Sequence, residues 1–246
     1  MDKMLYISMT GASHNTKALQ AHANNLANVS TSGFKRDFDQ ARSMPVFGDG
    51  LPARAYAMSE RPGTDFSSGS LQETGRDLDV AAVGDAWLAV QAADGSEAYV
   101  RTGSLQVDAL GMLRTASGLP VLGNAGPIAV PPEQKIEIGQ DGTISIRALG
   151  EAPSVMAEVD RLKLVLPDPK QLEKGADGLV RARDGLPFDA DANARVTSGF
   201  TEASNVNAVE EMTAMLSLSR QFELHVKMMR TAEDNSSAVA RVMQLS

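Results

Sequence analysis

Hydrophobic residues recur at helical spacing near the start of the chain. Leu5, Met9, Ala12, Thr16, Leu19, Ala23 and Leu26 follow one another at alternating steps of four and three residues. This spacing places them on one side of an α-helix and is typical of a heptad seam, in which Thr16 is the polar interruption. Because Thr31-Ser32-Gly33 favours the end of a helix, the pattern predicts an N-terminal helical segment within residues 1–36.

The last forty residues show the same periodicity. A seam runs through Met212, Met215, Ser219, Phe222, Val226 and Met229, weakens, and recovers at Ala240 and Met243. Asn207 followed by Glu210 resembles a capping box, with asparagine in place of the usual serine or threonine. Neither proline nor glycine occurs between Asn207 and Ser246. We therefore predict one long C-terminal helix within residues 205–246, roughly 55–60 Å long at about 1.5 Å per residue.

The residues between the two helices have a different pattern. Residues 37–70 contain prolines and glycines among polar residues without a sustained period, which predicts an extended linker. Residues 71–204 contain short β-type runs separated by Asp-Gly dipeptides at 94–95, 141–142, 177–178 and 184–185. Such spacing favours an antiparallel β-rich central domain over alternating strands and helices. The predicted fold class is α+β, with long terminal helices that pair as a coiled-coil-like bundle.

The apolar faces of both helices need to be covered. Isolated helices are marginal in water, and burial of an apolar face supplies most of their stability. One interpretation is that the helices pack on each other or on the β domain within one chain. Further apolar residues lie off the main seams, however, and imply more than one neighbour; they are Ile7, Leu216, Leu218, Leu224 and Met228. These residues favour a multi-copy assembly.

Composition excludes several classes of function. The chain has 246 residues, a formal net charge of −8 and no cysteine, so disulfides, thiol catalysis and zinc–thiolate sites are ruled out. Binding to nucleic acid is not expected, because the overall basic footprint it needs is missing. No apolar run approaches the length of a membrane span, about 20 residues, and the N-terminus lacks the apolar core of a signal peptide. We expect neither a membrane span nor a cleaved signal.

Motifs that carry catalysis or cofactor binding are missing from the sequence. The phosphate-binding loop, the dinucleotide-binding glycine pattern and the nucleophile elbow do not occur. His14, His22 and His225 lie on the predicted helices without a second histidine or a carboxylate at metal-site spacing. The Asp189-x-Asp191-x-Asn193 run lacks the glycine and glutamate of a calcium loop. We expect no enzyme activity, no metal and no cofactor, although a hydrolase or binding module on the β domain is an alternative.

The motifs at the inner ends of both helices resemble those of the flagellar rod and hook axial protein family. Ala23-Asn24-Asn25-Leu26-Ala27-Asn28 followed by Thr31-Ser32-Gly33-Phe34-Lys35 resembles the N-terminal signature, and Glu202-Ala203-Ser204-Asn205-Val206-Asn207 resembles the C-terminal element. Leu78-Asp79-Val80-Ala81 and Tyr99-Val100-Arg101-Thr102-Gly103 are similar to the shared β domain. Within the family, the chain length, the Met1-Asp2 start and the segment 159–165 are most similar to proximal-rod members.

The resemblance implies a structural subunit of the proximal rod, a hollow drive shaft that transmits motor torque across the periplasm. Its partners would be copies of itself, other proximal-rod and distal-rod proteins, and the flagellar export apparatus, which would export it without a cleaved signal. A distal-rod or hook-like role is the alternative. Asn24, Asn25 and Asn28 would pack and cap the helix end. The expected assembly interface comprises Leu5, Met9, Ala12, Leu19, Ala23, Asn25, Leu26, Asn28, Gly33, Phe34, Ser204, Asn205, Val206, Met212, Met215, Phe222, Val226 and Met229.

Overall fold

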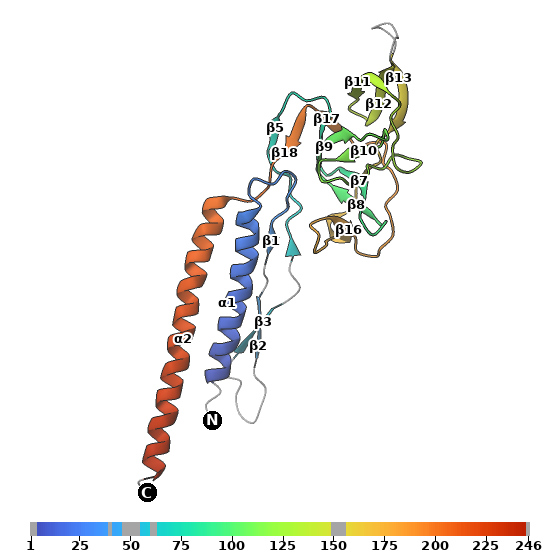
Figure 1. Ribbon diagram of the computed structural model, residues 1–246. Helices are drawn as coiled ribbons and strands as arrows, with labels where there is room; N and C mark the ends of the chain where they lie inside the picture. Colours follow the sequence, from blue (N-terminus) through green and yellow to red (C-terminus); the bar gives the residue numbers. More distant parts are fainter. Residues whose placement is uncertain (1–3, 39–40, 46–54, 60–62, 149–155, 245–246) are drawn as a thin grey trace. The chain divides into compact units, whose positions relative to one another are not determined.

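A computed structural model of the chain describes residues 4–38, 41–45, 55–59, 63–148 and 156–244. The expected order of an N-terminal helix, a β-rich middle and a C-terminal helix is confirmed (Figure 1). The described elements are α1 (Met4–Ala27), β1 (Asp37–Phe38), β2 (Ala41–Pro45), β3 (Ala55–Ser59), β4 (Gly63–Thr64), β5 (Leu71–Glu73), β6 (Asp79–Ala82), β7 (Trp87–Gln91), β8 (Glu97–Val100), β9 (Thr102–Val107), β10 (Leu113–Thr115), β11 (Glu133–Ile138), β12 (Thr143–Ala148), β13 (Ala157–Arg161), β14 (Leu164–Val165), the 3₁₀ turn η1 (Pro169–Gln171), β15 (Leu172–Lys174), β16 (Val180–Ala182), β17 (Val196–Ser198), β18 (Phe200–Glu202) and α2 (Ala208–Gln244).

The chain divides into two compact units. The helical unit consists of residues 1–29, 36–65 and 206–246, and the β unit consists of residues 30–35 and 66–205. The helical unit contains α1, α2 and two short antiparallel strand pairs, β1–β4 and β2–β3. The segment predicted as an extended linker, residues 37–70, supplies these pairs. Parts of that prediction, at 39–40, 46–54 and 60–62, lie outside the described residues.

Side-chain capping explains where α2 begins. The Asn207 side chain accepts hydrogen bonds from the backbone N–H groups of Val209 and Glu210, at 3.0 and 3.4 Å. These bonds satisfy donors that have no partner within the first turn of a helix, so the predicted N-cap is confirmed. The Glu210 side chain does not complete a capping box; it lies 2.9 Å from Arg36 in an ion pair.

The β unit is built from antiparallel sheets. The strand orders are β10-β9-β6-β17, β14-β7-β8-β16-β15, β11-β12-β13 and β18-β5. The predicted Asp-Gly turns at 94–95, 141–142 and 177–178 join consecutive antiparallel strands. In each turn the aspartate side chain accepts the backbone N–H of the residue two positions later, at 2.9, 3.2 and 3.1 Å, as expected of an Asx turn. The fourth dipeptide follows β16 and leads into irregular backbone.

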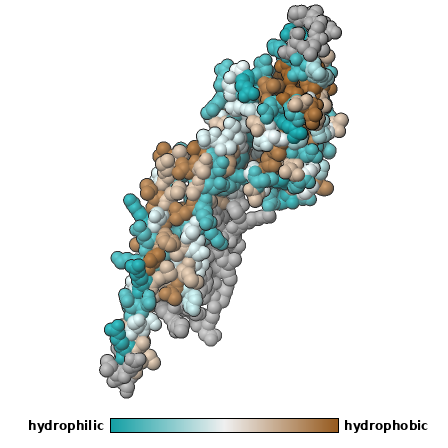
Figure 2. All heavy atoms as spheres, in the orientation of Figure 1, coloured by the Kyte–Doolittle hydropathy of each residue, from teal (hydrophilic) through white to brown (hydrophobic). Residues whose placement is uncertain are grey.

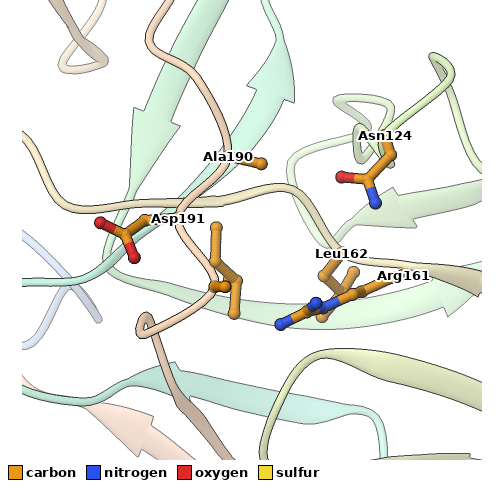
Figure 3. A pocket seen from close by; sticks show the side chains of 7 residues that line it. Asn124, Arg161, Leu162, Ala190 and Asp191 are labelled. Carbon is orange, nitrogen blue, oxygen red and sulfur yellow. The ribbon is translucent and has the colours of Figure 1, made fainter.

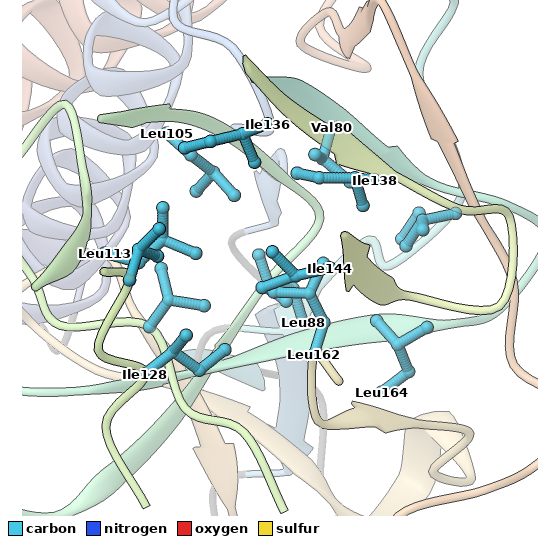
Figure 4. Packing of buried hydrophobic residues seen from close by; sticks show 14 of the residues in the cluster. Val80, Leu88, Leu105, Leu113, Ile128, Ile136, Ile138, Ile144, Leu162 and Leu164 are labelled. Atoms are coloured by element: carbon cyan, nitrogen blue, oxygen red, sulfur yellow. The ribbon is translucent and has the colours of Figure 1, made fainter. Parts of the chain in front are cut away.

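Aliphatic side chains from several strands form the main core of the β unit (Figure 4). Ile136 and Ile138 of β11 and Ile144 of β12 are buried there, while the intervening Glu137 is exposed. This alternation is the period of two that places one face of a strand against a core. The other members labelled in the figure are Val80, Leu88, Leu105, Leu113, Ile128, Leu162 and Leu164.

A second cluster in the β unit contains four aromatic residues. Trp87 packs edge-on against Phe66, with ring centroids 5.8 Å apart, and Tyr99 contacts Phe188 at 5.3 Å. The Tyr99 hydroxyl donates to Glu97 at 2.9 Å and accepts the Phe188 N–H at 2.8 Å. Burial raises the pKa of Tyr99 well above its ordinary value, because a phenolate is poorly solvated in an apolar cluster.

Candidate assembly interface on the terminal helices

The two long helices lie side by side and antiparallel in the helical unit (Figure 1). Near the end of α1, His22 contacts Glu211 at the start of α2; further along, Gly11 lies against the ring of His225. A Cβ atom on Gly11 would come within 2.5 Å of that ring, so the close approach requires glycine. The buried residues of α1 are small or polar, namely Ser8, Ala12, Asn15, Ala18 and Asn25.

The sequence-predicted seams lie beside this buried face. On α1, Ala12 is buried and Leu19 and Leu26 are half-buried, whereas Leu5, Met9 and Ala23 are exposed. On α2, Met215, Val226 and Met229 are half-buried, and Met212 and Phe222 are exposed. In the helical unit, each seam is therefore partly buried and partly exposed to solvent.

Large apolar side chains of both helices are exposed to solvent. Their exposed fractions are 53% for Met9, 64% for Leu216 and 60% for Leu224. Other exposed members are Leu5, Tyr6, Val209, Met212, Phe222, Met228, Val239 and Met243. Figure 2 shows apolar side chains gathered over α1 and α2. Exposed apolar side chains gathered in this way are typical of an interaction site.

Glu211 is a buried carboxylate at the inner end of the helix pair. Its Oε2 lies 2.5 Å from Nδ1 of His22 and accepts a hydrogen bond from Nδ2 of Asn25 at 3.3 Å. Its Oε1 forms an ion pair with Nε of Arg36 at 2.7 Å. Because a charged group loses its hydration when buried, it needs such partners in the folded state. We call these four residues the Glu211 cluster.

Asn25 also connects α1 to the strand that follows it. Its side-chain amide donates to the Asp37 carbonyl and accepts the Asp37 N–H, both at 2.9 Å. Asn28 donates to the carbonyl of Asn24 at 2.9 Å, which satisfies a group left without a partner at the end of a helix. The expectation that these asparagines pack and cap the helix end agrees with this geometry.

In the β unit, the two signature motifs contact each other directly. The Gly33 N–H donates to the Glu202 carbonyl at 2.7 Å, and the Asn205 N–H donates to the Phe34 carbonyl at 3.4 Å. The Asn205 side chain donates to the Ser67 carbonyl at 3.2 Å. Gly33 has a φ of +71°, a left-handed conformation that favours glycine. The structure thus brings together Gly33, Phe34 and Asn205 of the expected interface.

Glu202 is the buried centre of this junction. One carboxylate oxygen accepts from Nζ of Lys35 at 2.6 Å and from the Gly69 N–H at 2.9 Å, and the other accepts from Nε of Arg101 at 2.9 Å. Both cations also lie over the Trp87 ring, at 5.9 and 5.3 Å from its centroid. Trp87 thus packs between Phe66 and the two paired cations.

A pocket of about 320 Å³ lies elsewhere in the β unit (Figure 3). Arg161 and Asp191 are the charged residues of its lining, and Asn124 and Leu162 are among the others. This arrangement supplies neither a nucleophile next to a base nor a pair of carboxylates. Across the part of the chain that the structure describes, there is no group of three or more residues suited to hold a metal ion. Among the same residues, no helix is long and apolar enough to cross a membrane.

Known flagellar proteins are similar to the chain over its whole length. Family models match residues 5–35 (flagella basal body rod protein), 81–146 (flagellar hook protein FlgE/F/G D1 domain) and 197–242 (flagellar basal body rod FlgEFG protein, C-terminal). The flagellar basal-body rod protein FlgF of Escherichia coli is 42% identical over 252 residues, and that of Salmonella typhimurium is 40% identical, with all of each chain covered. FlgF of Caulobacter vibrioides is 32% identical over 255 residues, again covering all of both chains.

The chain belongs to the FlgF family of flagellar basal-body rod proteins. It is therefore a structural protein of the flagellar basal body, and a part in motility follows. The distal-rod or hook-like alternative is not favoured, because the relatives that match over the full length at the highest of these identities are FlgF proteins.

The sequence did not predict which charged residues of this rod protein pair with one another. Lys35 and Glu202 were part of recognised motifs, but nothing in their spacing indicated that they bind each other and Arg101. His22, Arg36 and Glu211 were missed in the same way. A usable signal was present for two of them: Lys35 and Glu202 are the charged residues of the two quoted motifs, and charged residues that become buried are nearly always paired.

Proposed function

We propose that this chain is a subunit of the proximal rod that polymerises through α1 and α2 into a hollow shaft and transmits motor torque. Its partners would be copies of itself and neighbouring proximal-rod and distal-rod subunits. The single observation that supports this is the apolar surface of the helix pair, where Met9, Leu216 and Leu224 are mostly exposed. Burial of such side chains stabilises an assembly by about 1.5–3 kcal/mol each.

The same proposal covers the route and the location of the subunit. We propose that the flagellar export apparatus delivers it and that the assembled subunit lies in the periplasmic part of the basal body. Support for this comes from full-length similarity to basal-body rod proteins. The 18 residues of the expected interface stay a proposal. Those with hydrogen bonds inside the subunit, such as Asn25 and Gly33, would hold its fold. The exposed ones, such as Met9 and Met212, would contact neighbouring subunits.

A charge on the exposed helical surface tests the proposal. Leu216→Asp places a carboxylate where a neighbour is expected, and because Leu216 is 64% exposed, the change leaves the packing of the subunit itself intact. The variant is expected to be absent from purified basal bodies and to fail to restore swimming in a strain that lacks the chain. Leu110→Asp is the matched control, since Leu110 is an exposed leucine of the β unit.

Two results contradict the proposal. If Leu216→Asp enters basal bodies and restores swimming as well as the parent chain, the helical surface is not the interface. If Leu110→Asp fails equally, the defect is not specific to the helices. Imaging of labelled basal bodies tests the proximal position, because a label at the hook end would place the subunit elsewhere.

A further inference from the structure

The buried face of α1 repeats itself along the helix. Ser8, Asn15 and His22 are spaced by seven residues, and so are Gly11, Ala18 and Asn25. Small or polar side chains therefore follow one another at equivalent places on the face that contacts α2. Packing discriminates weakly between registers where a slip of seven residues exchanges one small side chain for another. Gly11 is the exception, because a slip would bring Met4 or Ala18 against His225 in its place. A feature at the other end of the helix pair would strengthen the selection of the observed register.

The Glu211 cluster is the strongest candidate for that feature. In the observed register the buried carboxylate has His22, Asn25 and Arg36 as partners. A slip of seven residues in one direction would replace His22 and Asn25 by Asn15 and Ala18, and a slip in the other direction would place Glu211 beyond the end of α1, which is at Ala27. Either slip leaves a buried charge short of partners, which is strongly destabilising.

Arg36 strengthens the selection because it approaches from a different segment. It follows α1 in the chain, and β1 begins at the next residue, Asp37. The Asn25 side chain fixes Asp37 to α1 through two hydrogen bonds with the Asp37 backbone, both at 2.9 Å. The cation is thus held at a defined place relative to α1, and it pairs with Glu211 at 2.7 Å. A single polar group that fixes the register of paired helices is a well-attested use of buried charge.

We propose that Glu211 is a positioning residue that sets the register of α1 on α2. The inference deepens the proposed rod function, since the register decides which apolar side chains of the two helices face outward together. It does not depend on rod assembly, because the helix pair lies within one chain.

Engineered cysteines test the register in the full-length chain, which has no cysteine of its own. The pair G11C/H225C reports the observed register, in which Gly11 lies against His225. The pairs G11C/L218C and G11C/A232C, each combined with H225A so that the cysteine at position 11 meets no histidine ring in any of the three chains, report slips of seven residues in the two directions. With Glu211 present, the 11–225 disulfide is expected to exceed either of the others by about tenfold or more. With Glu211→Leu, the excess is expected to fall to about twofold or less.

Two controls separate register from folding. Glu223→Leu removes an exposed acid from the same helix and is expected to keep the tenfold excess. The emission of Trp87, the one tryptophan of the chain, reports whether the β unit is folded, and it is expected to be unchanged in every variant. Glu211→Gln keeps the shape of the side chain without its charge, and is expected to give an intermediate ratio.

The proposal is overturned if Glu211→Leu retains the parent ratio, or if Glu223→Leu loses it. Equal cross-linking of the three pairs in the parent chain, or cross-linking of none, also overturns it, since the cluster then fixes no register. These outcomes are distinguishable from failure of the proposed function. The ratios are measured in the isolated chain, whereas Leu216→Asp measures entry into basal bodies.

Discussion

Arg101 donates its Nε–H to Glu202 across 2.9 Å, although 101 positions separate the two residues in the chain. Both side chains are almost completely buried, and Lys35 completes the group at 2.6 Å from Glu202. The pairing joins the signature motif after α1, the residue between β8 and β9, and the motif before α2 within one unit. A buried charge without a partner is strongly destabilising, so loss of any one of the three residues should lower the stability of the β unit.

Glu202→Gln is expected to destabilise the β unit by about 3–5 kcal/mol, because Lys35 and Arg101 lose their counter-charge while they remain buried. The measurement is urea unfolding followed by the emission of Trp87, which both cations face. Glu137→Gln is the control. It breaks an exposed pair with Lys135 on β11 and should leave the unfolding midpoint nearly unchanged, because water screens exposed ion pairs. Similar unfolding midpoints for the two variants would show that the buried group contributes little.

Gly33→Ala is expected to destabilise the junction for two reasons. The residue would take a φ of +71°, which costs a non-glycine residue about 1–2 kcal/mol, and its Cβ would lie 2.9 Å from the Thr102 methyl group. Gly75→Ala is a matched control, since Gly75 has a φ of +69° and nothing within 4 Å of the added atom. The difference between their unfolding free energies measures the steric contact alone, and equal losses would argue against it.

Asn25→Ala removes two hydrogen bonds to the Asp37 backbone and one to Glu211. Each bond contributes about 0.5–1.5 kcal/mol, and the orphaned buried groups add to the loss. Amide exchange at Asp37, whose N–H Asn25 accepts, is expected to accelerate at least about tenfold. Asn24→Ala removes an exposed bond to the Asp37 side chain at 3.3 Å and should leave the Asp37 exchange rate nearly unchanged. Slow exchange in both variants would contradict the assigned role.

Tyr99 should make the β unit sensitive to alkali. Burial raises the pKa of its hydroxyl in the folded chain, whereas an unfolded tyrosine titrates near about 10. The stabilising contribution is therefore fully present below about pH 10 and is lost as the pH rises above that value, because only the unfolded state releases the proton. Tyr99→Phe is expected to lower the urea midpoint near neutral pH and to flatten its decline above about pH 10. A parallel decline in both chains would exclude Tyr99 as the cause.

Local sequence patterns predicted most of the fold. Heptad spacing predicted α1 and α2, and three Asp-Gly dipeptides marked turns between consecutive strands, because the aspartate side chain closes such a turn without help from distant residues. The short pairs β1–β4 and β2–β3 were not foreseen. Strands of two or five residues that contain neither valine nor isoleucine carry little periodic signal, and distant residues select their partners.

The sequence predicted only part of the candidate assembly interface and of the contact between α1 and α2. The seams located the apolar residues, yet α1 contacts α2 through Gly11, His22 and Asn25, which carry no hydrophobic signal. Close approach of two helices depends on small side chains, and Gly11 is necessary only because His225 lies against it. Likewise, partners for Glu202 and Glu211 come from remote segments, so spacing along the chain could not identify them.

The outward methionines of the helix pair have a chemical consequence. Met9, Met212 and Met228 are exposed in the single chain, and oxidation of a thioether to a sulfoxide turns a flexible apolar side chain into a polar one. A subunit that meets peroxide before it reaches its neighbours would have a more polar helical surface, which would bind those neighbours less strongly. Once neighbours cover the thioethers, the same oxidant would reach them slowly. The age of a subunit, measured from its release to its incorporation, would then determine how well it assembles.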